Sequence, residues 1–218
     1  MKGTKRVITS LIAAILLVAL GGMAVLPIGV RGQFIAEAAG KGKTAKAKKN
    51  AKDAAALNKI IKAQVKSGAS ISRDLNNSSY IWGNKGRLEG INWSGSYGLS
   101  GSISLKAFSG LKSFNCFGNK LTQLNLNECV NLQKLYCEIN EIKKLDLRGN
   151  KNLLLLECSC NQLKELNLSR NNKLTSLTCD QNLFTRLDVS KNQKLELIEC
   201  NQGVTISGAP KVCVIHEM

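Results

Sequence analysis

Aromatic residues and histidine are scarce in this 218-residue chain: Phe, Trp and Tyr make up 5% of it, and histidine occurs once. With so few aromatic side chains, a hydrophobic core must be filled by aliphatic ones, which favours a thin, repetitive architecture. The single histidine, His216, is expected to be an exposed tail residue. No G-x-S-x-G, P-loop or H-E-x-x-H motif occurs, and the acidic residues form no obvious catalytic pair. We therefore expect no enzymatic activity, no cofactor and no metal site.

The positive charge of the chain is unevenly distributed. The formal net charge is +16, but residues 1–66 hold 13 basic and 2 acidic residues, whereas residues 67–218 hold 18 and 13. A basic groove interleaved with stacking aromatic side chains, which single-strand-binding proteins use, is absent. The sequence therefore predicts no nucleic-acid partner.

The first 39 residues have the features of an export signal. Three basic residues among the first six precede an uncharged run, residues 7–30, and Ala36-Glu37-Ala38 offers an A-x-A cleavage site. About 20 apolar residues can also span a bilayer, so residues 1–39 are either a cleaved signal peptide or a membrane anchor that uses residues 7–30. Both alternatives place the rest of the chain outside a bacterial cytoplasm, secreted or at the cell surface. No cysteine follows the apolar run closely enough for a lipoprotein signal.

The next two segments differ in composition. Residues 40–53 are small and rich in lysine, so we expect a flexible linker, with adhesion to an anionic cell-wall polymer as the functional alternative. Residues 54–87 are expected to cap the domain that follows. Within them Leu57, Ile60, Ile61 and Val65 recur at helical spacing, which predicts a short amphipathic helix that ends near Gly68.

Residues 88–203 repeat with a period of 21 residues. Five cysteines are spaced 21 apart: Cys116, Cys137, Cys158, Cys179 and Cys200. Three residues after the first four of them comes an asparagine, at Asn119, Asn140, Asn161 and Asn182. Gly203 replaces the fifth asparagine, which predicts that regular stacking ends there and that residues 204–218 form a C-terminal cap or tail.

The second half of each unit echoes the first. Leu145-x-Leu147-x-x-Asn150 and Leu166-x-Leu168-x-x-Asn171 illustrate this second motif, in which Cys129 occupies the asparagine position of an earlier unit. The combined pattern, L-x-x-L-x-C-x-x-N-x-L-x-x-L-x-L-x-x-N, resembles the nested bacterial leucine-rich repeats known as the IRREKO type. The resemblance covers roughly residues 88–203. It implies a β-rich solenoid of leucine-rich-repeat coils, and a binding scaffold whose ligand it does not name.

The repeated residue types predict how the coils pack. Each L-x-C or L-x-L tripeptide alternates as a short strand must, so that each unit contributes to two parallel strand ladders. The asparagine amides are expected to satisfy backbone groups of their own coil and of the next. In-register neighbours stay about 4.8 Å apart, farther than disulfides prefer, so we predict free, buried thiols in the cysteine column. Cys160 and Cys213 are the candidates for reactive or paired thiols, and Cys158-x-Cys160 is too tightly spaced for a zinc site.

The outward positions of the first strand column are the candidate ligand-binding face. They carry acids and apolar groups, and we single out Phe117, Tyr136, Glu138, Leu155, Glu157, Thr178, Asp180, Leu197 and Glu199. The apolar members either mark a contact patch or are ordinary surface residues. The second column carries a mixed set of charges and is expected to be solvated.

These features predict a non-catalytic secreted or cell-surface module that binds or adheres to a protein. The alternatives are a structural repeat protein associated with cell wall or glycan, and an N-terminal fragment of a larger surface protein.

Overall fold

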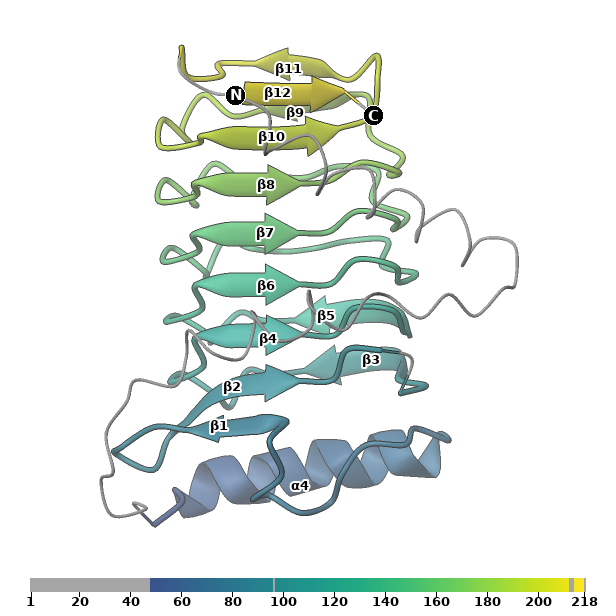
Figure 1. Ribbon diagram of the computed structural model, residues 1–218, viewed down its shortest axis with the longest axis vertical. Coiled ribbons are helices and arrows are strands. Elements are labelled where there is room, and N and C mark those ends of the chain that lie inside the picture. The colour runs from purple at the N-terminus through teal and green to yellow at the C-terminus, as the bar shows by residue number, and fades with distance from the viewer. Residues whose placement is uncertain (1–47, 96, 212–213, 218) are drawn as a thin grey trace, which may run out of the picture. The chain divides into compact units, whose positions relative to one another are not determined.

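The computed structural model describes residues 48–95, 97–211 and 214–217 (Figure 1). The predicted signal or anchor, residues 40–47 of the predicted linker, and Cys213 lie outside the described residues. Within the described ranges, no helix has the length and apolar character needed to cross a membrane.

In the described part of the chain, the helix α4 (Ala51–Lys66) comes before the strands. It begins after Asn50, whose side-chain oxygen accepts hydrogen bonds from the backbone N–H groups two and three residues further on. It ends before Gly68, whose φ of +95° lies in the left-handed region that glycine adopts without steric cost. The predicted helix is thus present. It starts three residues before the expected boundary at residue 54, so residues 51–53 are helical and do not belong to a flexible tether.

Two polar contacts attach α4 to the first coil. The buried carboxylate of Asp53 accepts hydrogen bonds from Arg87 Nε at 2.8 Å and from the backbone N–H of Leu88 at 2.9 Å. Near the other end of the helix, the side chain of Gln64 exchanges two hydrogen bonds, both 3.1 Å long, with the backbone of Ser100. Because the first coil has no preceding coil to cover it, the helix shields that end of the core from water.

The chain after the helix winds into a solenoid (Figure 1). Its main sheet has eight strands in the order β1-β2-β4-β6-β7-β8-β10-β12, and two smaller sheets pair β3 with β5 and β9 with β11. Only β1 runs antiparallel to its neighbour. The strands are β1 (Tyr80–Trp82), β2 (Leu88–Asn92), β3 (Ser100–Ser104), β4 (Ser113–Asn115), β5 (Lys120–Asn125), β6 (Lys134–Tyr136), β7 (Leu155–Glu157), β8 (Ser176–Thr178), β9 (Arg186–Asp188), β10 (Leu197–Cys200), β11 (Thr205–Ser207) and β12 (Val214–Glu217).

The register of the main sheet reproduces the 21-residue period. The central residues of β4, β6, β7, β8 and β10 lie side by side: Phe114, Leu135, Leu156, Leu177 and Ile198. The predicted first ladder is therefore confirmed. The second ladder forms regular strands only at its two ends, in the β3–β5 and β9–β11 pairs.

In the middle of the second ladder, the coils separate. Each coil makes one backbone hydrogen bond to the previous one as the second motif begins, for example from Gln162 N to Ile142 O at 2.9 Å. Beyond that point open grooves lie between the coils, one of about 210 Å³ beside Lys144–Arg148 and one of about 820 Å³ between residues 164–169 and β9. The leucines of these segments still point inward and are buried.

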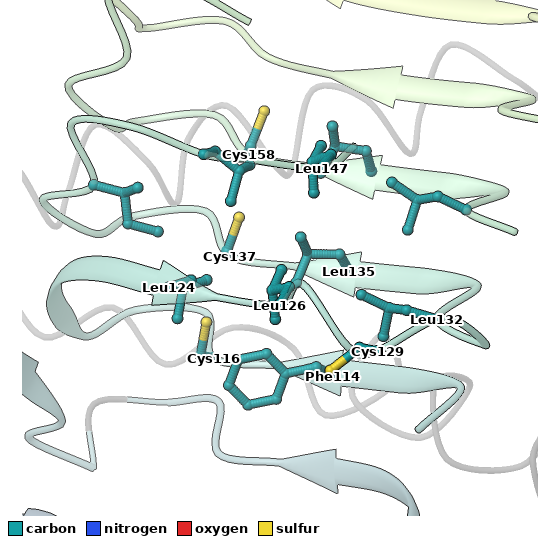
Figure 2. Packing of buried hydrophobic residues seen from close by; sticks show 14 of the residues in the cluster. Phe114, Cys116, Leu124, Leu126, Cys129, Leu132, Leu135, Cys137, Leu147 and Cys158 are labelled. Carbon is teal, nitrogen blue, oxygen red and sulfur yellow. The ribbon is translucent and has the colours of Figure 1, made fainter. Parts of the chain in front are cut away.

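The core is a stack of aliphatic and sulfur-bearing side chains (Figure 2). Leu126, Leu135 and Leu147 lie beside the column of Cys116 and its 21-residue repeats, and each of these side chains is buried. A cluster of buried aromatic rings lies in the first coils, where Trp93 packs edge-on against Tyr80 and Phe114 with centroid distances of 6.2 and 6.1 Å. The expectation of an aliphatic, repetitive core therefore holds.

The first asparagine ladder joins neighbouring coils, as the sequence predicts. The side-chain oxygen of Asn161 accepts a hydrogen bond from the backbone N–H of Ile142 at 3.0 Å. Its amide nitrogen donates to the carbonyl oxygens of Cys137 at 2.9 Å, Cys158 at 3.1 Å and Ser159 at 3.2 Å. Asn119, Asn140 and Asn182 repeat this pattern. Each amide therefore satisfies backbone groups of two coils at once.

The second asparagine ladder only donates. The amide nitrogen of Asn171 donates to the carbonyl oxygens of Leu147 at 3.1 Å and Asn150 at 2.9 Å, while its buried side-chain oxygen has no hydrogen-bond partner. Asn150 and Asn192 behave in the same way. Cys129 fits this column because its thiol can also donate, here to Leu105 O at 3.2 Å.

Candidate binding face

The outward side of the main sheet, here called the strand face, is formed by the first and third residues of β4, β6, β7, β8 and β10 and by the residue after each inward cysteine. The chain turns sharply after this face. The turn requires a left-handed backbone at Gly118, Ile139, Cys160 and Gln181, with φ between 51° and 69°. This conformation is costly for a β-branched side chain such as Ile139.

Three carboxyl groups from consecutive coils gather on the strand face. Glu157 lies in β7 beside Tyr136 of β6, while Glu138 and Asp180 come two residues after β6 and β8. Ser159 Oγ donates a hydrogen bond to Asp180 Oδ1. Burial raises the pKa of Glu138 well above its ordinary value, and a hydrogen bond to Glu157 and the charges of Glu157 and Asp180 raise it further. The strand face therefore concentrates acidic groups within a chain that is basic as a whole.

The structure places all nine predicted residues on this face. Phe117, Leu155, Leu197, Glu138, Glu157, Glu199 and Thr178 are half-buried, whereas Tyr136 and Asp180 are 6% and 4% exposed. The interpretation of Tyr136 as an exposed apolar group is therefore wrong: its ring is buried, and Leu155 and Leu197 are the better apolar probes. The hydrogen bond between Ser159 and Asp180 was not predicted, because the two residues are 21 positions apart in the chain and the pattern carries no local signal for their contact.

The opposite side of the solenoid carries mixed charges, as expected. Asp146 and the largely exposed Arg148 form an ion pair with a 2.8 Å separation, and the hydrogen bonds from Arg148 lower the pKa of Asp146 to about 2. The larger groove is lined by Lys164 and Arg186 but also by Glu165 and Asp188. This side therefore shows no concentration of one charge comparable with the strand face.

The cysteine chemistry is that of buried thiols. Cys116, Cys129, Cys137, Cys158, Cys160 and Cys179 are free, and burial raises the pKa of Cys116, Cys137, Cys158 and Cys179 above that of an ordinary thiol. Cys160, half-buried in its turn, has its pKa raised to about 11, again chiefly by burial. Among the described residues, no group of three or more His, Cys, Asp or Glu side chains could hold a metal ion.

Comparison with solved structures identifies the architecture. The leucine-rich-repeat ectodomain of the receptor kinase SOBIR1 from Arabidopsis thaliana matches with a TM-score of 0.60 over 73% of this chain and 97% of its own, at 18% sequence identity. The chain has a leucine-rich-repeat fold. No protein-family model matches the sequence, and no curated protein matches it significantly.

Bacterial leucine-rich-repeat proteins also appear among the structural neighbours. The functional domain of InlJ from Listeria monocytogenes, described as including a cysteine ladder, is 30% identical over 53% of this chain, with a TM-score of 0.45. A leucine-rich-repeat protein of Leptospira interrogans is 25% identical over 51% of this chain, with a TM-score of 0.46. This leucine-rich-repeat chain spans 28% and 32% of those two structures.

Proposed function

We propose that this protein is a non-catalytic, secreted or cell-surface leucine-rich-repeat module that binds a protein ligand through its strand face. The observation that carries the proposal is the strand face itself, where half-buried apolar side chains alternate with carboxyl groups on a rigid stack of parallel strands. Side chains held by a regular scaffold lose little conformational freedom on binding, which favours affinity. The nested 21-residue pattern of the units supports membership of the bacterial IRREKO-type class.

The domain organisation follows the same proposal. Residues 1–39 direct export, as a cleaved signal or as an anchor, and the lysine-rich segment from residue 40 to the start of α4 separates the solenoid from the cell. Residues 88–203 form the repeat array, α4 and β1 cap one end, and residues 204–218 cap the other. Immunoblots of fractionated cells with antibody to the solenoid test the first statement, because a cytoplasmic pool at the mass of the complete chain would contradict it.

Substitutions on the strand face test the binding function. Leu155→Ser and Leu197→Ser remove half-buried apolar groups from the face, and Leu183→Ser is the matched control because Leu183 is 58% exposed and lies outside the face. The full chain is immobilised, and surface proteins of the producing organism and of its environment are passed over it. A partner retained by the wild type and by Leu183→Ser, but lost by the face variants with unchanged circular dichroism, supports the proposal. Equal retention by all four proteins contradicts it.

A cell-wall or glycan-associated structural role is the second candidate. Its support is the lysine-rich composition of residues 40–53, which suits an anionic polymer. Protein retained on isolated cell walls and released by ~1 M salt favours this role, since that salt concentration screens exposed charges beyond about 3 Å. Free protein in the medium favours the soluble binder.

A further inference from the structure

Three acidic groups of the strand face, Glu138, Glu157 and Asp180, form no ion pair with a lysine or arginine among the described residues. Glu157 in β7 lies on the coil between those that carry Glu138 and Asp180; its register neighbours are Tyr136 in β6 and Thr178 in β8, each two residues before one of these acids. Among the outward positions of β4, β6, β7, β8 and β10, Lys134 is the only cation. Carboxyl groups this close repel each other when they are ionised, which destabilises the folded protein. An arrangement with this cost suggests a counterpart of opposite charge.

A second observation points to a ligand at the same place. The Oε2 atom of Glu138 is buried, and no N–H group or hydroxyl of the described residues donates a hydrogen bond to it. The remaining buried atoms without a partner are the three amide oxygens of the second asparagine ladder, so Glu138 provides the single carboxyl oxygen of this kind in the described ranges. A buried polar atom without a partner costs about 1–3 kcal/mol, and a donor that reached it would remove that cost.

We infer that the strand face binds a basic segment of a partner protein, a run of lysine or arginine side chains whose cations contact Glu138, Glu157 and Asp180. This inference rests on the proposed function and names the chemistry of its partner. An ammonium group offers three donors and a guanidinium group five, which suits a cluster of acceptor-only carboxylates. Asp180 is already oriented for this role, because Ser159 Oγ holds one of its oxygens.

The apolar residues of the face favour a peptide over a small cation. Leu155 lies two residues before Glu157 in β7, and Leu197 lies in β10; both are half-buried. The methylene stems of lysine and arginine cover such apolar surface while their charged ends reach the carboxyl groups. No described group of three or more acidic, cysteine or histidine side chains could hold a metal ion, which argues against a divalent cation as the occupant.

Binding of a cation should be linked to loss of a proton. Burial and the hydrogen bond to Glu157 raise the pKa of Glu138, so this carboxyl keeps its proton at a pH where an exposed glutamate is ionised. A cationic ligand favours the ionised form, and the complex therefore releases a proton as it forms. Affinity should rise with pH until Glu138 is ionised in the free protein. Glu138→Gln cannot release this proton and should flatten that dependence.

The test measures binding of a synthetic peptide with alternating lysine and glycine to the full chain by isothermal titration calorimetry. Glu157→Gln and Asp180→Asn each remove one charge from the face, while Glu165→Gln and Asp188→Asn remove one charge from the opposite side. We expect each face variant to bind about tenfold more weakly, as loss of ~1.4 kcal/mol implies. The control variants should stay within about twofold of the wild type. Circular dichroism confirms that all four variants are folded.

The remaining outcomes separate this inference from the proposed function. A peptide with acetylated lysines or with glutamate in place of lysine should not bind, and binding of either one as tight as the lysine peptide overturns the inference. Equal effects of face and control variants also overturn it, because attraction is then a property of the whole chain. If the strand-face leucine variants lose a partner while Glu157→Gln and Asp180→Asn retain it, the binding function stands and the basic-segment chemistry is wrong.

Discussion

The first asparagine ladder needs side chains that both accept and donate hydrogen bonds, whereas the second needs only donors. The same substitution should therefore destabilise the two ladders unequally. Asn161 accepts a hydrogen bond from the backbone N–H of Ile142 and donates to the carbonyl oxygens of two coils. Asn171 only donates. A cysteine thiol can replace a donor, as Cys129 does toward Leu105 O, but it is a weak acceptor. We therefore predict that Asn161→Cys is far more damaging than Asn171→Cys.

The magnitudes follow from the groups left unpaired. Asn161→Cys leaves the buried N–H of Ile142 without its acceptor, which costs about 1–3 kcal/mol, and removes at least one carbonyl bond worth about 1 kcal/mol. The expected loss is therefore roughly 2–4 kcal/mol. In Asn171→Cys both carbonyls keep another donor, since Leu147 O still accepts from Asn150 N and Asn150 O from Leu153 N. That loss should be at most about 1 kcal/mol.

Urea unfolding of the full chain, monitored by circular dichroism under reducing conditions, measures the loss of unfolding free energy in both variants. Because repeat proteins gain stability from each interface between coils, the midpoints are compared at equal slope. The reciprocal variant, Cys129→Asn, supplies a second donor to a column that needs only donors, so it should be neutral or stabilising. Equal losses for the two cysteine variants, or a larger loss for Asn171→Cys, would refute the distinction between the ladders.

Three further changes have expected outcomes. Asp53→Ala should lower the free energy of unfolding by about 2–4 kcal/mol, since it leaves the buried N–H of Leu88 without its acceptor and removes the carboxylate partner of Arg87 Nε. Asp146→Ala, at an exposed ion pair, should cost under ~1 kcal/mol, and urea titration compares the two variants. Cys160→Asn should leave the free energy of unfolding unchanged or raise it by up to ~1 kcal/mol, because asparagine tolerates the left-handed turn. Cys158→Asn places an amide in the core and should lower the free energy of unfolding by several kcal/mol. Losses of similar size at both positions would contradict this prediction. Thiol labelling at pH 8 should be slow in the folded protein, because Cys160, with a pKa of about 11, is about a hundredfold less ionised than a thiol of pKa 9. Denaturant should make all thiols react quickly. Fast labelling of most cysteines without denaturant would contradict the burial of the cysteine column.

The sequence was a good guide wherever a position repeats. The 21-residue spacing of Leu135, Leu156 and Leu177 predicts the register of the strands because a solenoid stacks equivalent positions. Hydrogen bonds from the asparagine three residues after a ladder cysteine, both to its own coil and to a neighbouring coil, could be predicted because an amide both donates and accepts. In these columns each residue packs against equivalent residues of the neighbouring coils, so the local sequence pattern is enough to predict its contacts.

Positions that do not repeat were predicted less well. The start of α4 was placed too late because the lysine-rich composition of residues 40–53 concealed Asn50 as a helix cap, and because Asp53 finds its partner 34 residues away. The burial of Tyr136 and the meeting of Ser159 with Asp180 depend on how outward side chains of different coils lean together. Inward and outward residues alternate along a strand, but that alternation does not specify how tightly outward residues pack.

The same separation of buried and outward positions means that the net charge does not describe the surroundings of the proposed strand-face site. A total of +16 suggests an anionic ligand, yet the fold places Glu138, Glu157 and Asp180 together on the strand face and most lysines of the solenoid in turns and on the opposite side. Charges farther away than about 8–10 Å are largely screened at physiological salt, so a ligand on the strand face responds mainly to the carboxyl groups near it. The inward leucines and cysteines recur in each 21-residue unit, whereas the outward residues differ between units. It follows that the repeat determines the scaffold, whereas under the proposed function the partner would be selected by the few outward side chains that break the repeat.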